Sequence, residues 1–334
     1  MNNPTSSWRG KKILVTGAGG FIGSHLAETL AVRGATVRAL VHYNALGTRG
    51  WLDSSKHAAD MEIVAGDIAD RDAVRSAAKD VDIIFHLAAL IAIPYSYLAP
   101  LAYIKTNIEG TFNVLAAARE FAISRVIHTS TSEVYGTAKY VPIDEEHPLQ
   151  GQSPYSASKI AADKLVEAFH LSFGVSAVTV RPFNTFGPRQ SARAVIPTIV
   201  MQALAAPDQP IHIGSTSPRR ELNFVLNTVD GFIKAAECDA AVGQTINLAS
   251  QSEVSIGELI AMVSRILGRE LRVQSDEKRV RPLGSEVERL LGSNAKAHAL
   301  IGWKPATDIH EGLECTIAWL RENLSRYRPK EYTI

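Results

Sequence analysis

Cysteine is scarce in this chain of 334 residues. The only two, Cys238 and Cys315, lie far apart and show no spacing typical of a metal or redox site. A disulfide framework is therefore not expected, and no metal site is predicted. A protein with so few cysteines is compatible with a reducing environment, so we expect it to be cytoplasmic.

Long hydrophobic runs are also absent. The most apolar stretch, residues 81–93, contains Asp82 and His86 and is followed by Pro94. It is shorter than the roughly 18 residues needed to cross a bilayer, so no membrane association is predicted. Residues 1–12 lack the apolar centre of a secretory signal, and we expect them to form a loose tail.

Neither sign of charge is in excess, since 35 Lys and Arg balance 34 Asp and Glu. The broad basic surface of a nucleic-acid-binding protein is thus missing, and nucleic acid is not an expected partner. The hydrophobic share of 46% is that of a globular protein. At roughly 150 residues per domain, the length is sufficient for two domains.

Short β-branched runs alternate with helical patterns through the first half of the chain. The clearest helical patterns cover residues 101–121 and 155–173, where apolar positions recur every three or four residues. Such alternation predicts an α/β protein with a Rossmann-type, doubly wound parallel sheet. The predicted strands cover residues 11–16, 37–42, 61–67, 81–89, 124–131 and 175–182.

The pattern changes after Pro182, where prolines interrupt shorter segments. We therefore expect a dinucleotide-binding domain over residues 1–182 and a smaller C-terminal α/β substrate-binding lobe over residues 183–334. The chain is expected to return to the sheet around residues 222–250, which contain another helical pattern and another strand pattern. Capping signatures at Ser255–Glu258 and Asp308–Glu311 predict helices over residues 256–267 and 309–324.

A glycine-rich turn connects the first predicted strand to the first predicted helix. Gly17, Gly20 and Gly23 allow a tight turn and the close approach of a pyrophosphate to the helix N-terminus, with Phe21 and Ile22 between them. The G-x-x-G-x-x-G spacing differs from the usual dinucleotide-binding G-x-G-x-x-G. Its position after a strand nevertheless predicts a bound dinucleotide, and a turn without a ligand is the alternative.

The end of the second predicted strand, which is expected to border the adenosine, has no acidic residue. His42 stands where an Asp or Glu usually holds the ribose hydroxyls, so NAD and NADP are both compatible with the pocket. Asp67 follows the third strand and either accepts a hydrogen bond from the adenine amine or caps a helix. The other residues expected to border the cofactor are Ile68, Leu87, Ala88 and Ala89.

Tyr155 and Lys159 are four residues apart, and therefore on one face of the helix that Ser153 and Pro154 are expected to begin. An ammonium beside a phenol is expected to lower the phenol pKa and make Tyr155 a proton-transfer group. Such a pair is common on helix surfaces. The hydroxyl-rich segment 129–132 follows the fifth strand at the edge where ligands collect, and this favours a catalytic site.

Together these motifs resemble the extended short-chain dehydrogenase/reductase family over nearly the whole chain. The resemblance implies that Thr131, Tyr155 and Lys159 form the catalytic triad and that Lys159 also holds the nicotinamide ribose. It further implies that Asn107 lies beneath the site and that Asn184 contacts the phosphates of a nucleotide sugar. NAD, held tightly, is the expected cofactor, and a homodimer is the expected assembly.

The segment STSEVYG resembles the nucleotide-sugar 4,6-dehydratases, in which an acid at the position of Glu133 removes the proton on sugar carbon 5. The residue before it is Ser132, as in GDP-mannose dehydratases, whereas dTDP-glucose dehydratases have Asp there. The identity of the proton donor to the 6-hydroxyl is therefore open. The overall pattern is most similar to bacterial enzymes acting on UDP- or GDP-linked N-acetylglucosamine. A 4-epimerase, a UDP-glucuronate decarboxylase and a non-catalytic dinucleotide sensor are the alternatives.

Several later residues are expected to bind the substrate. Arginines near turns are suited to a diphosphate, because a guanidinium makes paired hydrogen bonds to phosphate oxygens. Each arginine is also compatible with an ordinary ion-paired surface position. The candidates are Arg189, Arg220, Arg281 and, in the GSEVERL segment, Glu286.

Overall fold

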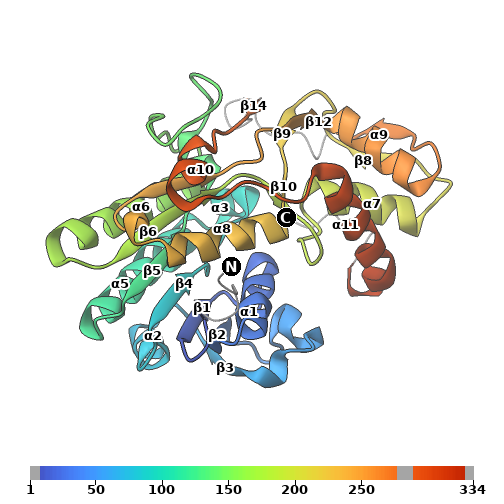
Figure 1. Ribbon diagram of the computed structural model, residues 1–334. Coiled ribbons are helices and arrows are strands. Elements are labelled where there is room, and N and C mark those ends of the chain that lie inside the picture. Colours follow the sequence, from blue (N-terminus) through green and yellow to red (C-terminus); the bar gives the residue numbers. More distant parts are fainter. Residues whose placement is uncertain (1–7, 277–288, 328–334) are drawn as a thin grey trace.

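The computed structural model describes residues 8–276 and 289–327, and its centre is a seven-stranded parallel sheet (Figure 1). The strand order is β11-β6-β5-β4-β1-β2-β3, which confirms the predicted doubly wound architecture. The strands are β1 (Lys12–Thr16), β2 (Thr36–His42), β3 (Met61–Gly66), β4 (Ile83–His86), β5 (Arg125–Thr129), β6 (Ala177–Pro182) and β11 (Thr245–Leu248).

Helices cover both faces of the sheet (Figure 1). Successive residues of a strand point to opposite faces, so Ile13 packs into the core beneath α1 and α8, whereas Leu14 packs into the core beneath α2, α5 and α6. Burial of both faces explains why the strands are continuous apolar runs. The helices are α1 (Phe21–Val32), α8 (Val225–Glu237), α2 (Arg71–Ala78), α5 (Gly110–Glu120) and α6 (Pro154–Phe173).

The two helices predicted most clearly from the sequence are both present. Helix α6 begins with a capping box between Ser153 and Ser156 and ends at Gly174, which has a left-handed φ of 70°. The other predicted helix is built from α4 (Pro100–Tyr103), a π-helical segment, η3 (Ile104–Glu109), and α5. It is preceded by α3 (Ile93–Leu98).

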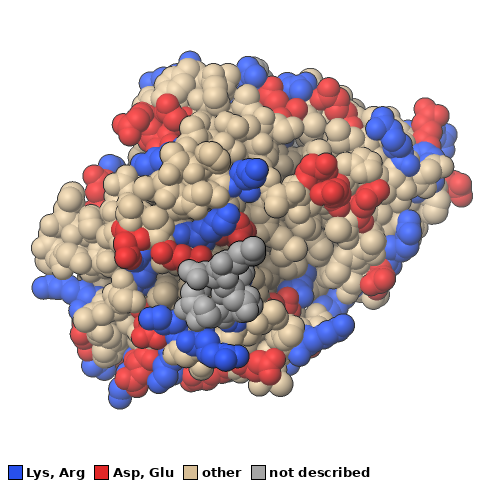
Figure 2. All heavy atoms as spheres, viewed as in Figure 1, with Lys and Arg blue, Asp and Glu red and all other residues tan. Residues whose placement is uncertain are grey.

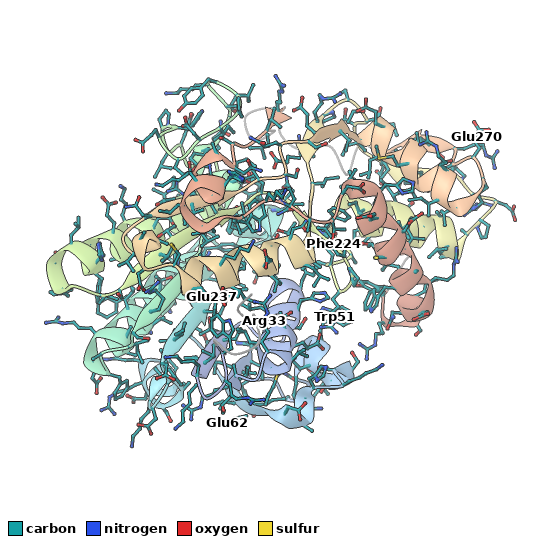
Figure 3. All side chains as sticks on the ribbon, viewed as in Figure 1. Arg33, Trp51, Glu62, Phe224, Glu237 and Glu270 are labelled. Atoms are coloured by element: carbon teal, nitrogen blue, oxygen red, sulfur yellow. The ribbon has the colours of Figure 1, made fainter. Side chains whose placement is uncertain are left out.

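The expectation of a loose tail is wrong for residues 8–12. Trp8 is only 2% exposed, and its ring lies 6.1 Å from that of Phe85 on β4. Its indole Nε1 donates to Glu237 at the end of α8, at 2.5 Å. Glu237 is labelled in Figure 3. This partner is 229 residues away in the sequence, so no local pattern could indicate the contact.

We expect Trp8→Ala to lower the free energy of unfolding by about 3–5 kcal/mol, the usual cost of removing a buried tryptophan side chain. Chemical denaturation followed by circular dichroism measures the change. A loss below about 1 kcal/mol would show that Trp8 does not pack as the structure has it.

The C-terminal lobe has its own hydrophobic core, and three small sheets support it. Helix α9 starts at the predicted capping box of Ser255 and Glu258, and Asp308 caps α11. The lobe's helices are α7 (Val195–Ala205), α9 (Ile256–Leu267) and α11 (Ile309–Asn323), whereas α10 (Ala295–Ile301) packs against β11 and α8 of the sheet. Its strands are β7 (Thr185–Phe186), β8 (Ile211–Ile213), β9 (Arg219–Glu221), β10 (Asn223–Phe224), β12 (Glu253–Ser255), β13 (Val273–Ser275) and β14 (Arg289–Leu290).

The chain does not stay in this lobe once it has entered it. Helix α8 covers the sheet, and β11 extends the sheet by pairing with β6 from Thr245 to Leu248. Over the described ranges, no helix is both long and apolar enough to span a membrane. Acidic and basic side chains are interspersed over the face shown in Figure 2, in keeping with the formal net charge of +1.

Candidate active site

A cavity of about 1830 Å³ lies between the carboxyl ends of the sheet strands and the C-terminal lobe. Residues from both parts of the chain line it, including the glycine-rich turn, the ends of β2 to β6, and the start of α7. Pockets for one small ligand usually measure about 300–1,000 Å³. The cavity therefore has room for a dinucleotide and a nucleotide sugar together.

The glycine-rich turn leaves no space for side chains. A Cβ on Gly17 would lie 2.8 Å from the backbone nitrogen of Ala88, and one on Gly23 would lie 2.1 Å from the carbonyl oxygen of Gly17. Gly20 precedes α1 without a side-chain cap, so the first N–H groups of the helix have no capping side chain. Together with Phe21 and Ile22, which line the cavity, these residues form a cradle suited to a pyrophosphate.

The residues predicted for the adenosine side also line the cavity: His42, Asp67, Ile68, Leu87, Ala88 and Ala89. Asp67 does not cap a helix, because the N-cap of α2 is Asp70. Its Oδ1 accepts a hydrogen bond from the backbone of Ala69 at 2.9 Å. The hydroxyl of Thr16 fixes the turn after β4 by accepting from the backbone nitrogens of Leu87 and Ala88, both at 3.1 Å.

The predicted catalytic residues meet at the same cavity: Thr131, Ser132, Glu133, Tyr155 and Lys159. The Nζ of Lys159 donates to the carbonyl oxygen of Thr129 at 2.6 Å, which fixes the ammonium at the end of β5. Glu133 lies in the 3₁₀ turn η4 (Ser132–Tyr135), and its backbone nitrogen donates to the hydroxyl of Thr131 at 3.2 Å.

The expected lowering of the Tyr155 pKa is not found. Burial raises the pKa of Tyr155, a hydrogen bond with Thr131 opposes the rise, and the negative charge of Glu133 adds to it. The ammonium of Lys159 is directed to the carbonyl oxygen of Thr129. Glu133 and Tyr155 both line the cavity.

The sequence analysis missed a buried carboxylate whose negative charge stabilises the ammonium of Lys159. Asp163, one helical turn after Lys159, accepts hydrogen bonds from Ser130 at 2.8 Å and from Arg181 at 2.9 Å. Burial would raise the pKa of Asp163, but a hydrogen bond with His128 and the charge of Arg181 outweigh it and lower the pKa. Burial also lowers the pKa of Lys159 to about 8, and the charge of Asp163 opposes that shift.

Asn107 lies behind the cavity wall and does not line it. It is 1% exposed, and its side chain donates to and accepts from the backbone of Leu90 at 2.9 and 2.8 Å. The same amide donates to the hydroxyl of Ser158 on α6 at 2.9 Å. Asn107 therefore anchors the chain after β4 to the helix that carries Tyr155 and Lys159.

Three buried polar atoms on the cavity wall have no hydrogen-bond partner within the described residues. They are the Nδ2 of Asn184, the hydroxyl of Thr129 and the Oε1 of Gln190. Buried polar groups are nearly always paired, so unpartnered ones in a cavity indicate a ligand that completes them. The Asn184 amide is thus placed to donate to a bound molecule.

The predicted arginines divide into three cases. Arg220 lines the cavity. Arg189 does not: its guanidinium makes two hydrogen bonds to Glu28 on α1, each 3.0 Å long, and the pair is largely buried. This pairing, formed across 161 residues, explains why the predicted role does not fit Arg189. Arg281 and Glu286 lie outside the described residues.

Four arginines that the sequence analysis did not select also line the cavity: Arg49 beside the glycine-rich turn, and Arg193, Arg219 and Arg289 in the C-terminal part. Glu253 on β12 joins Arg219 and Arg289, accepting from Arg219 Nε at 3.2 Å and from Arg289 Nε at 2.9 Å. Pairing of β9 with β12 and β14 creates this arrangement. The position of Arg219 beside Arg220 was the only local signal.

The chain is similar in sequence to known nucleotide-sugar dehydratases and epimerases. The family model described as GDP-mannose 4,6 dehydratase matches residues 14–316. A UDP-glucose 4-epimerase from Mycolicibacterium smegmatis is 32% identical, over 93% of this chain and 98% of the relative. A dTDP-glucose 4,6-dehydratase from Streptomyces griseus is 30% identical, over 95% of this chain and 96% of the relative.

A solved structure provides a third comparison. The dTDP-glucose 4,6-dehydratase from Streptomyces venezuelae, whose crystal structure has NAD bound, superposes with a TM-score of 0.84 at 28% identity, covering 95% of this chain and 99% of that one. The fold is thus shared over nearly the whole length. The protein belongs to the GDP-mannose 4,6 dehydratase family of short-chain-dehydrogenase-type enzymes, a family of nucleotide-sugar dehydratases and epimerases.

Proposed function

We propose that the protein is an NAD-dependent nucleotide-sugar 4,6-dehydratase. The observation that carries the proposal is the position of Glu133, which lines the same cavity as Tyr155 and Lys159. A 4-epimerase needs a group for the 4-hydroxyl alone. A dehydratase needs a second group that removes a proton from carbon 5, and Glu133 provides it.

In this proposal Tyr155 handles the proton of the sugar 4-hydroxyl. NAD held in this cavity would supply a reversible oxidation, accepting hydride from sugar carbon 4 and donating it to carbon 6. The phenol Oη exchanges a proton with the 4-hydroxyl oxygen, while Thr131, hydrogen-bonded to Tyr155, orients the phenol. Lys159 places a positive charge at the end of β5, where it favours a phenolate in the occupied site.

Glu133 carries out the elimination. Once carbon 4 is a ketone, the proton on carbon 5 is acidic, and the Glu133 carboxylate removes it. The carbon 6–oxygen bond then breaks, and the 6-hydroxyl departs as water with the proton that Glu133 has taken up. When carbon 6 is reduced, carbon 5 takes up a new proton, which comes from solvent. Ser132 is a poor acid at neutral pH, so in this proposal the same carboxylate acts first as base and then as acid.

The residues present fit NAD. Gly17, Gly20 and Gly23 would hold the pyrophosphate, Asp67 would accept from the adenine amine, and Lys159 would bind the nicotinamide ribose. Retention of the cofactor between the two halves of the reaction is required, because its loss would leave the sugar oxidised. We therefore infer tight binding.

The substrate side is basic. Arg220 and the unpartnered amide of Asn184 would contact the diphosphate, with Arg193, Arg219 and Arg289 nearby. Sequence resemblance favours an N-acetylglucosamine-type hexose linked to UDP or GDP as the substrate.

In the decisive experiment, purified protein and NAD are incubated with each member of a panel of UDP-, GDP-, CDP- and dTDP-linked hexoses. The mass of the product is then measured. Loss of one water from one of them supports the dehydratase. A product of unchanged mass with an inverted carbon 4 would establish the epimerase, which the similarity to the mycobacterial enzyme makes the second candidate. Loss of carbon dioxide from UDP-glucuronate would establish a decarboxylase.

We also propose that the protein is a homodimer. Large apolar side chains lie exposed on the neighbouring helices α4 to α6, and exposed apolar patches of this kind mark protein interfaces. A two-fold axis beside these helices would bury the patch against its own copy. The exposed residues are Leu101 (61%), Ile104 (51%), Phe112 (43%), Leu171 (75%) and Phe173 (47%).

We expect Ile104→Glu to convert the dimer into a monomer, because it places a charge within the apolar patch. Light scattering coupled to size-exclusion chromatography measures the mass. Val32→Glu, at a position 63% exposed at the end of α1, is the matched control and should leave the mass unchanged. A wild-type monomer at micromolar concentration would contradict the proposed assembly.

A further inference from the structure

One segment of the cavity wall lies directly against the glycine-rich turn. We call residues 43–55 the wall loop; Asn44, Thr48, Arg49 and Gly50 from it line the cavity. The backbone nitrogen of Trp51 donates to the carbonyl oxygen of Gly19 at 2.9 Å. A Cβ on Gly50 would lie 2.3 Å from that same oxygen, so the backbones of Gly50 and Gly19 pack together with no room for a side chain.

The wall loop is braced internally. Asn44 accepts from the backbone nitrogen of Thr48 at 3.1 Å and donates to its carbonyl oxygen at 2.8 Å. Arg49 Nε donates to Asp53 at 2.8 Å, within the 3₁₀ turn η1 (Gly50–Ser54). Because these bonds close the loop on itself, displacement of Trp51 would move the cavity-lining residues with it.

The C-terminal lobe holds the outer side of the wall loop. The Trp51 ring lies 5.3 Å from that of Trp319 on α11, in an edge-to-face arrangement, and 5.9 Å from that of Tyr327. The guanidinium of Arg326 lies 5.4 Å from the Trp51 ring centre. Figure 3 labels Trp51 on the side of the N-terminal part that faces α11.

The same cluster reaches the substrate side of the cavity. The Tyr327 hydroxyl donates to the carbonyl oxygen of Gln190 at 2.9 Å, and Gln190 lines the cavity. Arg326 Nη1 donates to the hydroxyl of Ser54 at 2.9 Å. One aromatic cluster thus joins the wall loop, α11 and the segment after β7.

We propose that Trp51 is a positioning residue for the bound dinucleotide. Its ring contacts with Trp319 and Tyr327 let the C-terminal lobe hold the wall loop against the glycine-rich turn, and this slows dissociation of NAD. The inference rests on the proposed function, in which the cofactor stays bound through both halves of the reaction. It assigns that retention to particular residues, two of which belong to the other lobe.

The test measures NAD dissociation and needs no substrate. Protein loaded with NAD is mixed with an excess of isotopically labelled NAD, and the unlabelled NAD retained after rapid desalting is followed by mass spectrometry. We expect Trp51→Ala and Trp319→Ala each to raise the dissociation rate by about tenfold, equivalent to roughly 1.4 kcal/mol of lost contacts. Trp51→Phe, which keeps an aromatic ring, should restore most of the retention.

Two controls separate positioning from general destabilisation. Trp8→Ala removes a buried tryptophan away from the wall loop, and Leu46→Ala shortens a side chain of the wall loop that is 88% exposed. Both should dissociate NAD at the wild-type rate. Wild-type rates in Trp51→Ala and Trp319→Ala would overturn the inference while leaving the proposed function intact. A wild-type protein that binds no NAD would overturn both.

Discussion

Replacement of Tyr155 by phenylalanine should reduce turnover of the nucleotide sugar by about 10²–10⁴-fold, the contribution that a positioned general acid or base usually makes. The phenol oxygen is the group on α6 placed to exchange a proton with the sugar 4-hydroxyl. Phenylalanine fills the same space, so packing is kept and only the proton-transferring atom is lost. Turnover is measured by product mass at saturating substrate.

The control for this variant is Tyr103→Phe. The Tyr103 ring lies 6.2 Å from that of Tyr155, and its hydroxyl donates to the carbonyl oxygen of Ala92. Removing this second hydroxyl should cost about 1 kcal/mol of stability and change turnover by less than tenfold. If Tyr155→Phe kept turnover within tenfold of the wild type, Tyr155 would not be the proton-transfer group.

The size of the loss in turnover depends on the pKa of the Tyr155 phenol, which the protein without its ligands does not lower. Burial raises the pKa of Tyr155, whereas catalysis near neutral pH requires a more acidic phenol. Among the described residues that line the cavity, Lys159 alone carries an ammonium, and Asp163 helps to keep it charged. We infer that the phenol would become more acidic when the positively charged nicotinamide ring of a bound cofactor adds to the charge of Lys159.

Sequence alone was sufficient for features determined by local spacing. Strands of the sheet were predictable because burial on both faces requires continuous apolar runs. Tyr155 and Lys159 were predictable as a pair because four residues make one turn of α6. Strand β4 ends earlier than predicted, at His86, because Leu87 and Ala88 turn their backbone nitrogens to the hydroxyl of Thr16.

Features that depend on distant partners were not predictable. Arg189 and Arg219 are each an arginine near a turn, yet one pairs with Glu28 and the other lines the cavity. The difference arises from which elements pack beside them, and a single sequence carries no sign of it. Trp51 shows the same limit, because its partner Trp319 lies on α11, near the other end of the chain.

Glu133→Gln should separate the two halves of the proposed reaction. The amide has nearly the shape of the carboxylate but does not accept a proton at neutral pH, so removal of the carbon 5 proton should slow by about 10²–10⁴-fold. Oxidation at carbon 4 depends on Tyr155 and should persist. After a denaturing quench, we expect a 4-keto sugar that still carries its 6-hydroxyl, detected by mass spectrometry.

Exchange with heavy water provides an independent measurement. Once a carboxylate has removed the carbon 5 proton, deuterium from the solvent enters at that carbon. Glu133→Gln should abolish this incorporation. Glu146→Gln, which changes an exposed acid in the loop before α6, is the control and should not.

Ser132→Ala isolates the second proton transfer. If Glu133 returns the proton to the departing hydroxyl, this variant keeps most of the wild-type turnover. An epimerase gives the opposite result for Glu133→Gln, because its sugar never loses the carbon 5 proton and its turnover would survive the change.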